Sequence, residues 1–152
     1  MTSVNDLMSH DVVTLDEADS LLHAGKLFRL DRIRHLPVVR GRKLVGLVTH
    51  RDYLREMTPE RRGNTENPLG IEAIMSHPVH TVTPETRARD ALRAMVDNKY
   101  GCLPVVDAKG NLVGILTETD LLRFADRILG AVDAESPAIQ EPPESLAERR
   151  HF

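Results

Sequence analysis

Aromatic residues are scarce in this sequence, and long apolar segments are missing. Among 152 residues there is no tryptophan, and the two tyrosines and three phenylalanines make up 3% of the chain. Because 41% of the residues are nevertheless hydrophobic, we expect a core built mainly from leucine, valine, isoleucine, alanine and methionine. The length suits one domain or two small halves that share a core.

The scarcity of cysteine indicates the redox environment in which the protein works. The single cysteine, Cys102, cannot form an internal disulfide bond, which is typical of a reducing environment. No apolar run approaches the length of a membrane-spanning helix, and the N-terminal stretch MTSVNDLMSHD lacks the regions of a signal peptide. We therefore expect a cytoplasmic protein with no membrane partner. The net charge of −3 also argues against nucleic acid as a partner.

Residue patterns of enzymes are absent as well. The sequence has no Ser-His-Asp arrangement, Walker loop or dinucleotide-binding glycine fingerprint. His77 and His80 are spaced i, i+3 on a predicted strand, so they do not share a face, and no further metal ligands flank them. We predict that the protein is not an enzyme and has no metal site, and a metal-dependent enzyme is the least favoured alternative.

An internal repeat dominates the chain. The stretch DLMSHDVVTL (6–15) aligns with AIMSHPVHTV (73–82) at an offset of 67 residues, since Met8 corresponds to Met75, and HLPVV (35–39) aligns with CLPVV (102–106). The offset becomes 68 at LVGLVT and LVGILT, because the preceding polar turn is longer in the second copy. We therefore expect repeat one at residues 1–57, a connector at 58–70, repeat two at 71–130 and a polar tail at 131–152, with a short helix at ESLAERR.

Each repeat predicts the element order β-α-β-β-α. The β-branched runs DVVTL and PVHTV are typical of strands, and Thr83 followed by Pro84 predicts the start of the next helix. The stretches LPVV and LVGLV, or LVGIL, predict two strands buried on both faces, and a second helix begins at Thr49 or Thr117. The fold class is therefore α/β (α+β). Apolar residues at helical spacing predict the buried stripes of the first helices at Ala18, Leu21, Leu22, Gly25 and Phe28, and at Ala88, Ala91, Leu92, Met95 and Val96.

The last predicted helix carries its own apolar stripe and ends at Gly130. This stripe either forms a dimer surface or packs inside the monomer. It consists of Leu121, Leu122, Ala125, Ile128 and Leu129.

The phrase Gly-apolar-apolar-Thr-x-x-Asp occurs in both repeats, as GLVTHRD (46–52) and GILTETD (114–120). A threonine followed three residues later by an acidic residue is typical of a capping box at a helix start. The same geometry favours a phosphate at the helix N-terminus and a ribose on the carboxylate. The glycine would keep the strand slim where a flat base approaches. The two interpretations are compatible.

These signatures together resemble the cystathionine-β-synthase (CBS) domain: "MS-x-x-V", "LPVV" and "G-h-h-T-x-x-D", where h is apolar, occur in order in both copies. Two such units resemble a Bateman module, here as a stand-alone CBS-pair protein. The resemblance implies two repeats packed with pseudo-two-fold symmetry and two clefts that bind adenosine-type ligands. It also implies a homodimer and a regulatory role, exerted on a partner protein in trans.

The resemblance also implies which residues contact the ligand. The aspartate of T-x-x-D would bind the ribose, and the threonine and the segment before LPVV would lie near phosphate. Arg51 favours a phosphate that Glu118 would repel, so we expect inequivalent clefts; exposed surface is the alternative for Arg34 and Arg51. Cys102 is expected to be a packed thiol beside the ligand. The predicted nucleotide-binding residues are Arg34, His35, Thr49, His50, Arg51, Asp52, Gly101, Cys102, Thr117, Thr119 and Asp120.

The sequence thus predicts a regulatory module that binds AMP, ADP or ATP and has no obligatory cofactor. One alternative is a structural dimerisation module, in which T-x-x-D is only a helix cap. Another is a ligand of the S-adenosylmethionine or NAD type.

Overall fold

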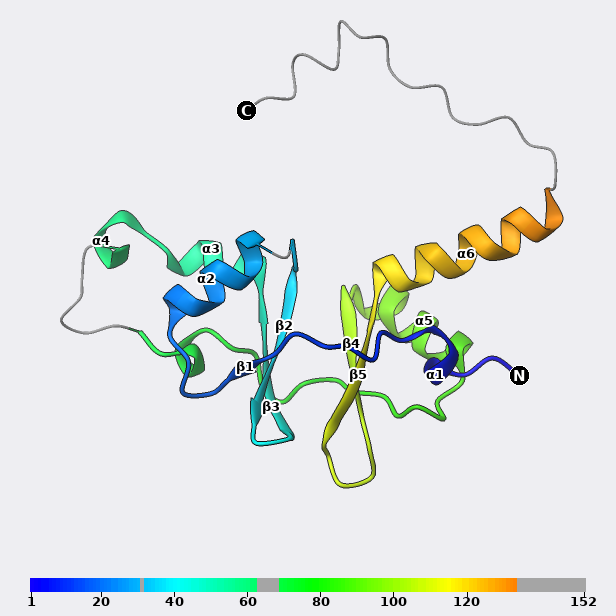
Figure 1. Ribbon diagram of the computed structural model, residues 1–152, viewed down its shortest axis with the longest axis horizontal. Coiled ribbons are helices and arrows are strands. Elements are labelled where there is room, and N and C mark those ends of the chain that lie inside the picture. Colours follow the sequence, from blue (N-terminus) through cyan, green and yellow to red (C-terminus); the bar gives the residue numbers. More distant parts are fainter. Residues whose placement is uncertain (31, 63–68, 134–152) are drawn as a thin grey trace, which may run out of the picture.

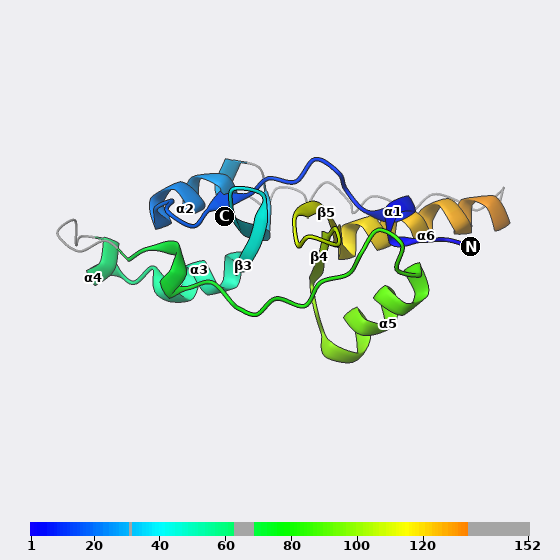
Figure 2. The ribbon, with the colours of Figure 1, turned by 90° about the horizontal axis from the view of Figure 1, so that it is seen from below.

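The computed structural model describes residues 1–30, 32–62 and 69–133. The centre of the predicted connector and the predicted tail from residue 134 onward, including ESLAERR, lie outside these residues. The described chain forms two lobes that lie side by side, each with a small sheet flanked by helices (Figures 1 and 2). This arrangement agrees with the predicted α+β class and with two repeats of one unit.

The elements follow the predicted β-α-β-β-α order in lobe one, and in lobe two they follow it without the first strand. Lobe one contains β1 (Leu15–Asp16), α2 (Leu21–Leu30), β2 (His35–Arg40), β3 (Lys43–Thr49) and α3 (His50–Glu56), followed by the short helix α4 (Pro59–Arg62). Lobe two contains α5 (Ala88–Asn98), β4 (Cys102–Val106), β5 (Leu112–Thr117) and α6 (Glu118–Val132).

The sheets are smaller than the sequence predicts. In lobe one β1 is parallel to β2, which is antiparallel to β3; in lobe two β4 and β5 form an antiparallel pair. DVVTL contributes only its last residue to a strand, because Val12 and Val13 face a cavity instead. PVHTV contributes an isolated parallel bridge between Val82 and Val105. The central strands β2 and β4 are largely buried, as expected, whereas β3 is more exposed.

Helix α5 begins at Ala88 and not at the predicted Thr83–Pro84. Thr83 donates its N–H group to the hydroxyl of Thr86 at 3.1 Å, which closes a turn before the helix. The N-terminal residues of the chain then pair with this segment, since Val4 donates to the carbonyl of Thr86 at 2.8 Å and Ala88 donates to that of Thr2 at 3.0 Å. These contacts hold the segment before Ala88 in a turn, where the sequence alone favoured a helix.

Some predicted stripe residues are exposed, because each helix covers only one face of a narrow sheet. Leu22 of α2 and both Leu92 and Val96 of α5 lie largely in solvent, and Ala18 precedes its helix. Helix α6 continues past Gly130, and its only buried residue is Asp120. Four members of its predicted stripe are exposed: Leu122, Ala125, Ile128 and Leu129.

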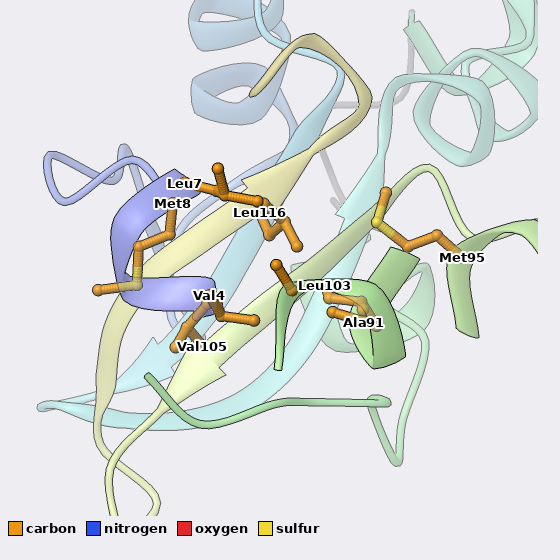
Figure 3. Close-up of a cluster of buried hydrophobic side chains, with 9 residues drawn as sticks. Val4, Leu7, Met8, Ala91, Met95, Leu103, Val105 and Leu116 are labelled. Carbon is orange, nitrogen blue, oxygen red and sulfur yellow. The ribbon is translucent and has the colours of Figure 1, made fainter. Parts of the chain in front are cut away.

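The N-terminal segments of the repeats are exchanged between the lobes. Helix α1 (Val4–Leu7), from repeat one, packs on α5 and α6 of lobe two, where Val4 joins the core formed by Leu103 and Leu116 (Figure 3). Conversely, the 3-10 helix η1 (Ile71–Ala73), from repeat two, places Ile71 in the core of lobe one. Neither repeat therefore completes its hydrophobic core from its own residues.

This exchange explains the two glycines of the repeated phrase. A Cβ atom on Gly46 would lie 2.4 Å from the Sδ atom of Met75, and one on Gly114 would lie 2.7 Å from that of Met8. Each glycine therefore makes room for a methionine of the other repeat, whereas the sequence suggested room for a base. The serine after Met8, Ser9, also exchanges two backbone hydrogen bonds with β5.

The two hairpin turns provide a second junction between the lobes. Leu44 donates its N–H group to the carbonyl of Gly110 at 3.2 Å, and Leu112 donates to that of Arg42 at 2.9 Å. These bonds join the hairpin ends of the strands. The starts of α3 and α6 lie at the opposite ends, where the candidate site is found.

Candidate functional site

Two cavities lie at the starts of α3 and α6. The repeat-one cavity has a volume of about 590 Å³ and is lined by Arg34, His35, Thr49, His50, Arg51, Leu54, Lys99, Gly101 and Glu118. The repeat-two cavity has a volume of about 680 Å³ and is lined by Ser9, Asp11, Val12, Val13, Arg32, Ile33, Arg34, His35, Gly101, Ile115, Thr117, Glu118, Thr119 and Leu122. Both volumes are in the range of small-molecule sites, and both cavities are lined by residues of the two repeats.

His35 lies at the centre of the site and lines both cavities. A Cβ atom on Gly101 would lie 2.6 Å from Nε2 of His35, so the imidazole fits only because this neighbour is glycine. Burial lowers the pKa of His35 below its ordinary value; Glu118 opposes this shift and Arg34 adds to it. The ring is therefore neutral at pH 7 and can accept or donate a hydrogen bond on the wall between the cavities.

The threonines of the repeated phrase cap the helices, as predicted. Thr49 accepts the N–H group of Asp52 at 3.1 Å, and Thr117 accepts that of Asp120 at 3.3 Å. The first residue of each helix donates its N–H group to the residue that precedes β2 or β4, since His50 donates to the carbonyl of Arg34 at 2.8 Å and Glu118 donates to that of Gly101 at 3.3 Å. The protein itself therefore uses two of the N–H groups that the sequence interpretation left for a phosphate.

The two aspartates differ in their environment. Asp120 is buried, and its carboxylate accepts the N–H group and the hydroxyl of Thr117 at 2.8 and 2.9 Å and the hydroxyl of Ser9 at 2.9 Å. Asp52 does not close such a box; its carboxylate lies 3.7 Å from the guanidinium group of Arg55. Neither aspartate is among the lining residues of these two cavities, so their expected role as ribose ligands stays a prediction.

The structure brings together most of the predicted site residues. Arg34, His35 and Gly101 line both cavities, and Thr117 and Thr119 line the repeat-two cavity. The repeat-one cavity is lined by Thr49, His50 and Arg51.

Cys102 is a buried thiol that lines neither cavity. Burial raises its pKa to about 12, so the group is protonated and unreactive at neutral pH. The side chain lies outside the lining of both cavities, so a contact between Cys102 and a ligand stays a prediction. The expectation that Cys102 packs as a small apolar group is confirmed.

Sequence reasoning missed several lining residues. Arg32 and Lys99 occupy corresponding positions before β2 and β4 and add one cation to each cavity. Val12, Val13 and Ile33 form an apolar wall of the repeat-two cavity. The repeat alignment would have revealed Arg32 and Lys99, because both are basic at the same place in the two copies.

Other classes of site find no support in the part of the chain that the structure describes. No group of three or more histidine, cysteine, aspartate or glutamate side chains is placed to hold a metal ion in residues 1–30, 32–62 and 69–133. Within the same ranges, every helix is too short or too polar to cross a membrane.

Known proteins with the same architecture have been solved with ligands. The plant protein CBSX2 from Arabidopsis thaliana, in complex with AMP, superposes with a TM-score of 0.75 and 29% identity, over 84% of this chain and 98% of that one. The CBS domain pair of protein MJ0100, in complex with 5′-methylthioadenosine and S-adenosyl-L-methionine, has a TM-score of 0.72 and 28% identity, over 83% and 97% of the two chains.

Sequence relatives include much longer proteins. Inosine-5′-monophosphate dehydrogenase from Korarchaeum cryptofilum is 38% identical over 112 residues, which are 73% of this chain and 22% of that protein. The present chain thus spans about a fifth of that relative's length. The sequence pattern of the CBS domain matches residues 4–58 and again residues 71–127. With two matched domains and the exchanged, pseudo-symmetric lobes described above, this chain belongs to the CBS-domain family, as a tandem pair.

Proposed function

We propose that this protein is a regulatory module that binds an adenine nucleotide between its two repeats and carries out no chemistry on it. The observation that carries this proposal is the pair of cavities whose walls combine both repeats. A ligand in such a cavity contacts both lobes at once, so its affinity depends on their relative arrangement. Differential affinity of this kind is the physical requirement for a ligand-driven switch.

The charges of the lining residues support a phosphorylated ligand. Arg34 and Arg51 line the repeat-one cavity together with Lys99, whereas Glu118 is its single acidic residue. Guanidinium groups bind phosphate oxygens through paired, charge-assisted hydrogen bonds. Complexes of similar proteins with AMP, or with S-adenosyl-L-methionine, support an adenosine-type ligand.

A ligand without phosphate is the second candidate, and the repeat-two cavity favours it. Asp11 and Glu118 there balance the charges of Arg32 and Arg34. This cavity therefore offers no net positive charge to a phosphate, and a zwitterionic ligand such as S-adenosylmethionine suits it.

The proposed regulation requires a partner surface, for which α6 is the candidate. Leu122, Ile128 and Leu129 are exposed along this helix, with exposed fractions of 70%, 51% and 58%. Apolar residues gathered on one element favour protein contacts, so we propose that α6 contributes to a homodimer. Sedimentation of the wild type and of an Ile128→Glu variant tests this: a dimer that the variant leaves intact contradicts a role for α6.

Ligand binding itself is tested by thermal unfolding with AMP, ATP, S-adenosylmethionine and NADH at millimolar concentration. A ligand that binds only the folded state stabilises it by RT ln(1 + [L]/Kd). We expect the largest shift with an adenine nucleotide and smaller shifts for Arg34→Ala and Arg51→Ala. Variants that bind ATP like the wild type would contradict the assignment of the phosphate contacts. No shift with any of these ligands would favour the structural dimerisation module.

A further inference from the structure

The two cavities are neighbours that share one wall. Four residues line both of them: Arg34, His35, Gly101 and Glu118. Gly101 corresponds to Arg34 in the repeat alignment, so the wall carries one arginine, from repeat one, and Glu118 is the only side chain beyond glycine that repeat two contributes to it. A ligand that extends beyond either cavity therefore reaches the other across the side chains of Arg34, His35 and Glu118.

Apolar contacts are concentrated on one side of this wall. Five apolar side chains line the repeat-two cavity, whereas Leu54 is the only one that lines the repeat-one cavity. Those five are Val12, Val13, Ile33, Ile115 and Leu122. A planar base needs such a surface, because its transfer from water depends on apolar contact area.

The missing apolar wall of the repeat-one cavity has a structural cause. The residues that correspond to Val13 and Ile33 are His80 and Tyr100, and their rings stack on each other with centroids 4.8 Å apart and an interplanar angle of 26°. Neither ring lines a cavity. The second repeat thus satisfies these side chains with each other and does not offer them to a base.

Positive charge is concentrated on the other side of the wall. In the repeat-one cavity Arg51 and Lys99 add to the shared Arg34, against the single carboxylate of Glu118. The residue that corresponds to Arg51 is Thr119, and the repeat-two cavity also contains Asp11. One cavity therefore has the walls for a base and the other the cations for phosphates.

We propose that the two cavities form one composite site for a single nucleoside polyphosphate. The base and ribose occupy the repeat-two cavity, and the outer phosphates cross the shared wall to Arg51 and Lys99. This inference rests on the proposed function and adds to it the stoichiometry and the basis for distinguishing ATP from AMP. In this arrangement the single phosphate of AMP stays in the repeat-two cavity, so the repeat-one cavity acts only on the longer nucleotides.

The test is a calorimetric titration of AMP and ATP into the whole chain. We expect one nucleotide per chain, with ATP binding more tightly than AMP. Arg51→Ala should weaken the binding of ATP about tenfold and change the affinity for AMP by no more than about twofold, because a hydrogen bond to a charged group is lost only for the longer ligand. Arg29→Ala is the matched control, since it removes the same charge from an exposed residue that lines neither cavity.

A second variant tests the role of the stacked rings. The double substitution His80→Val and Tyr100→Ile copies the repeat-one residues Val13 and Ile33 into the corresponding positions of repeat two and should create a second adenosine site per chain. Retention of the first AMP site reports that the variant is folded. An unchanged count of one adenosine per folded chain contradicts the explanation of the missing apolar wall.

The failures of the two proposals are distinguishable. The composite site is overturned if two ATP molecules bind per wild-type chain, or if Arg51→Ala weakens the binding of AMP and of ATP equally. Either result still leaves the protein a nucleotide-binding module. Absence of binding by every adenine nucleotide overturns both.

Discussion

The exchange of N-terminal segments makes a prediction about where a single substitution acts. Ile71 belongs to repeat two in the sequence, yet its side chain is fully buried in the core of lobe one with Leu36 and Val48. Ile71→Ala removes the carbons beyond Cβ, which contribute about 2.4 kcal/mol at roughly 0.8 kcal/mol each. With the cavity left behind, the loss of unfolding free energy is about 2–5 kcal/mol.

Amide hydrogen exchange locates this loss. We expect the amides of β2 and β3 in lobe one to exchange at least about 30-fold faster in Ile71→Ala, while those of β4 and β5 change much less. Val4→Ala is the matched control, since Val4 belongs to repeat one but is fully buried in lobe two. Val4→Ala should instead increase the amide exchange rates of β4 and β5. The reasoning is refuted if Ile71→Ala weakens mainly the strands of lobe two, or if Val4→Ala weakens mainly those of lobe one.

Three further predictions concern single side chains. Gly114→Ala should lower the unfolding free energy by about 1–3 kcal/mol in urea titrations, because its Cβ atom would lie 2.7 Å from Sδ of Met8. Gly130→Ala is the control and should not lower the unfolding free energy, because its Cβ atom would have no neighbour within 4 Å. Equal losses of unfolding free energy in the two variants would contradict the proposed clash with Met8. Cys102, with a pKa of about 12, should resist iodoacetamide at pH 8 until the chain is unfolded by urea, and rapid labelling of the folded chain would show that the thiol is accessible. Because burial lowers the pKa of His35 in the folded state, the unfolded state takes up its proton first as the pH falls below about 6.5. The free energy of unfolding should therefore decline below that pH, and it should decline less in His35→Gln. Identical dependence of the unfolding free energy on pH in the two proteins would exclude His35 as the cause.

The strands and helix starts were predictable from the sequence because they depend on local signals. LPVV and LVGLV lie in the paired strands β2 and β3, and Thr49 and Thr117 cap the helices that follow. Polar turns, apolar runs and capping residues act over a few positions, so one sequence suffices to read them.

The exchange of segments was not predictable in the same way. Val4 and Ile71 are both fully buried, but they occupy corresponding positions in the two copies, so the alignment does not say which lobe each segment joins. The difference between the two aspartates is also non-local. The hydroxyl of Ser9, which is 111 residues away in the chain, holds Asp120, whereas in the described residues the exposed Ser76 makes no hydrogen bond to Asp52.

The exchanged segments also determine when the molecule can finish folding. At roughly 5–20 residues per second, synthesis of the 111 positions from Ser9 to Asp120 takes about 6–22 s. During that time the apolar side chains of α1 have no core to enter, because β4, β5 and α5 do not yet exist. On a crowded polysome the same arm fits the completed second lobe of a neighbouring chain, which offers identical contacts. Exchange of an identical segment between chains is a general route to domain-swapped dimers at high local concentration, whereas dilution favours closure of each segment on its own chain.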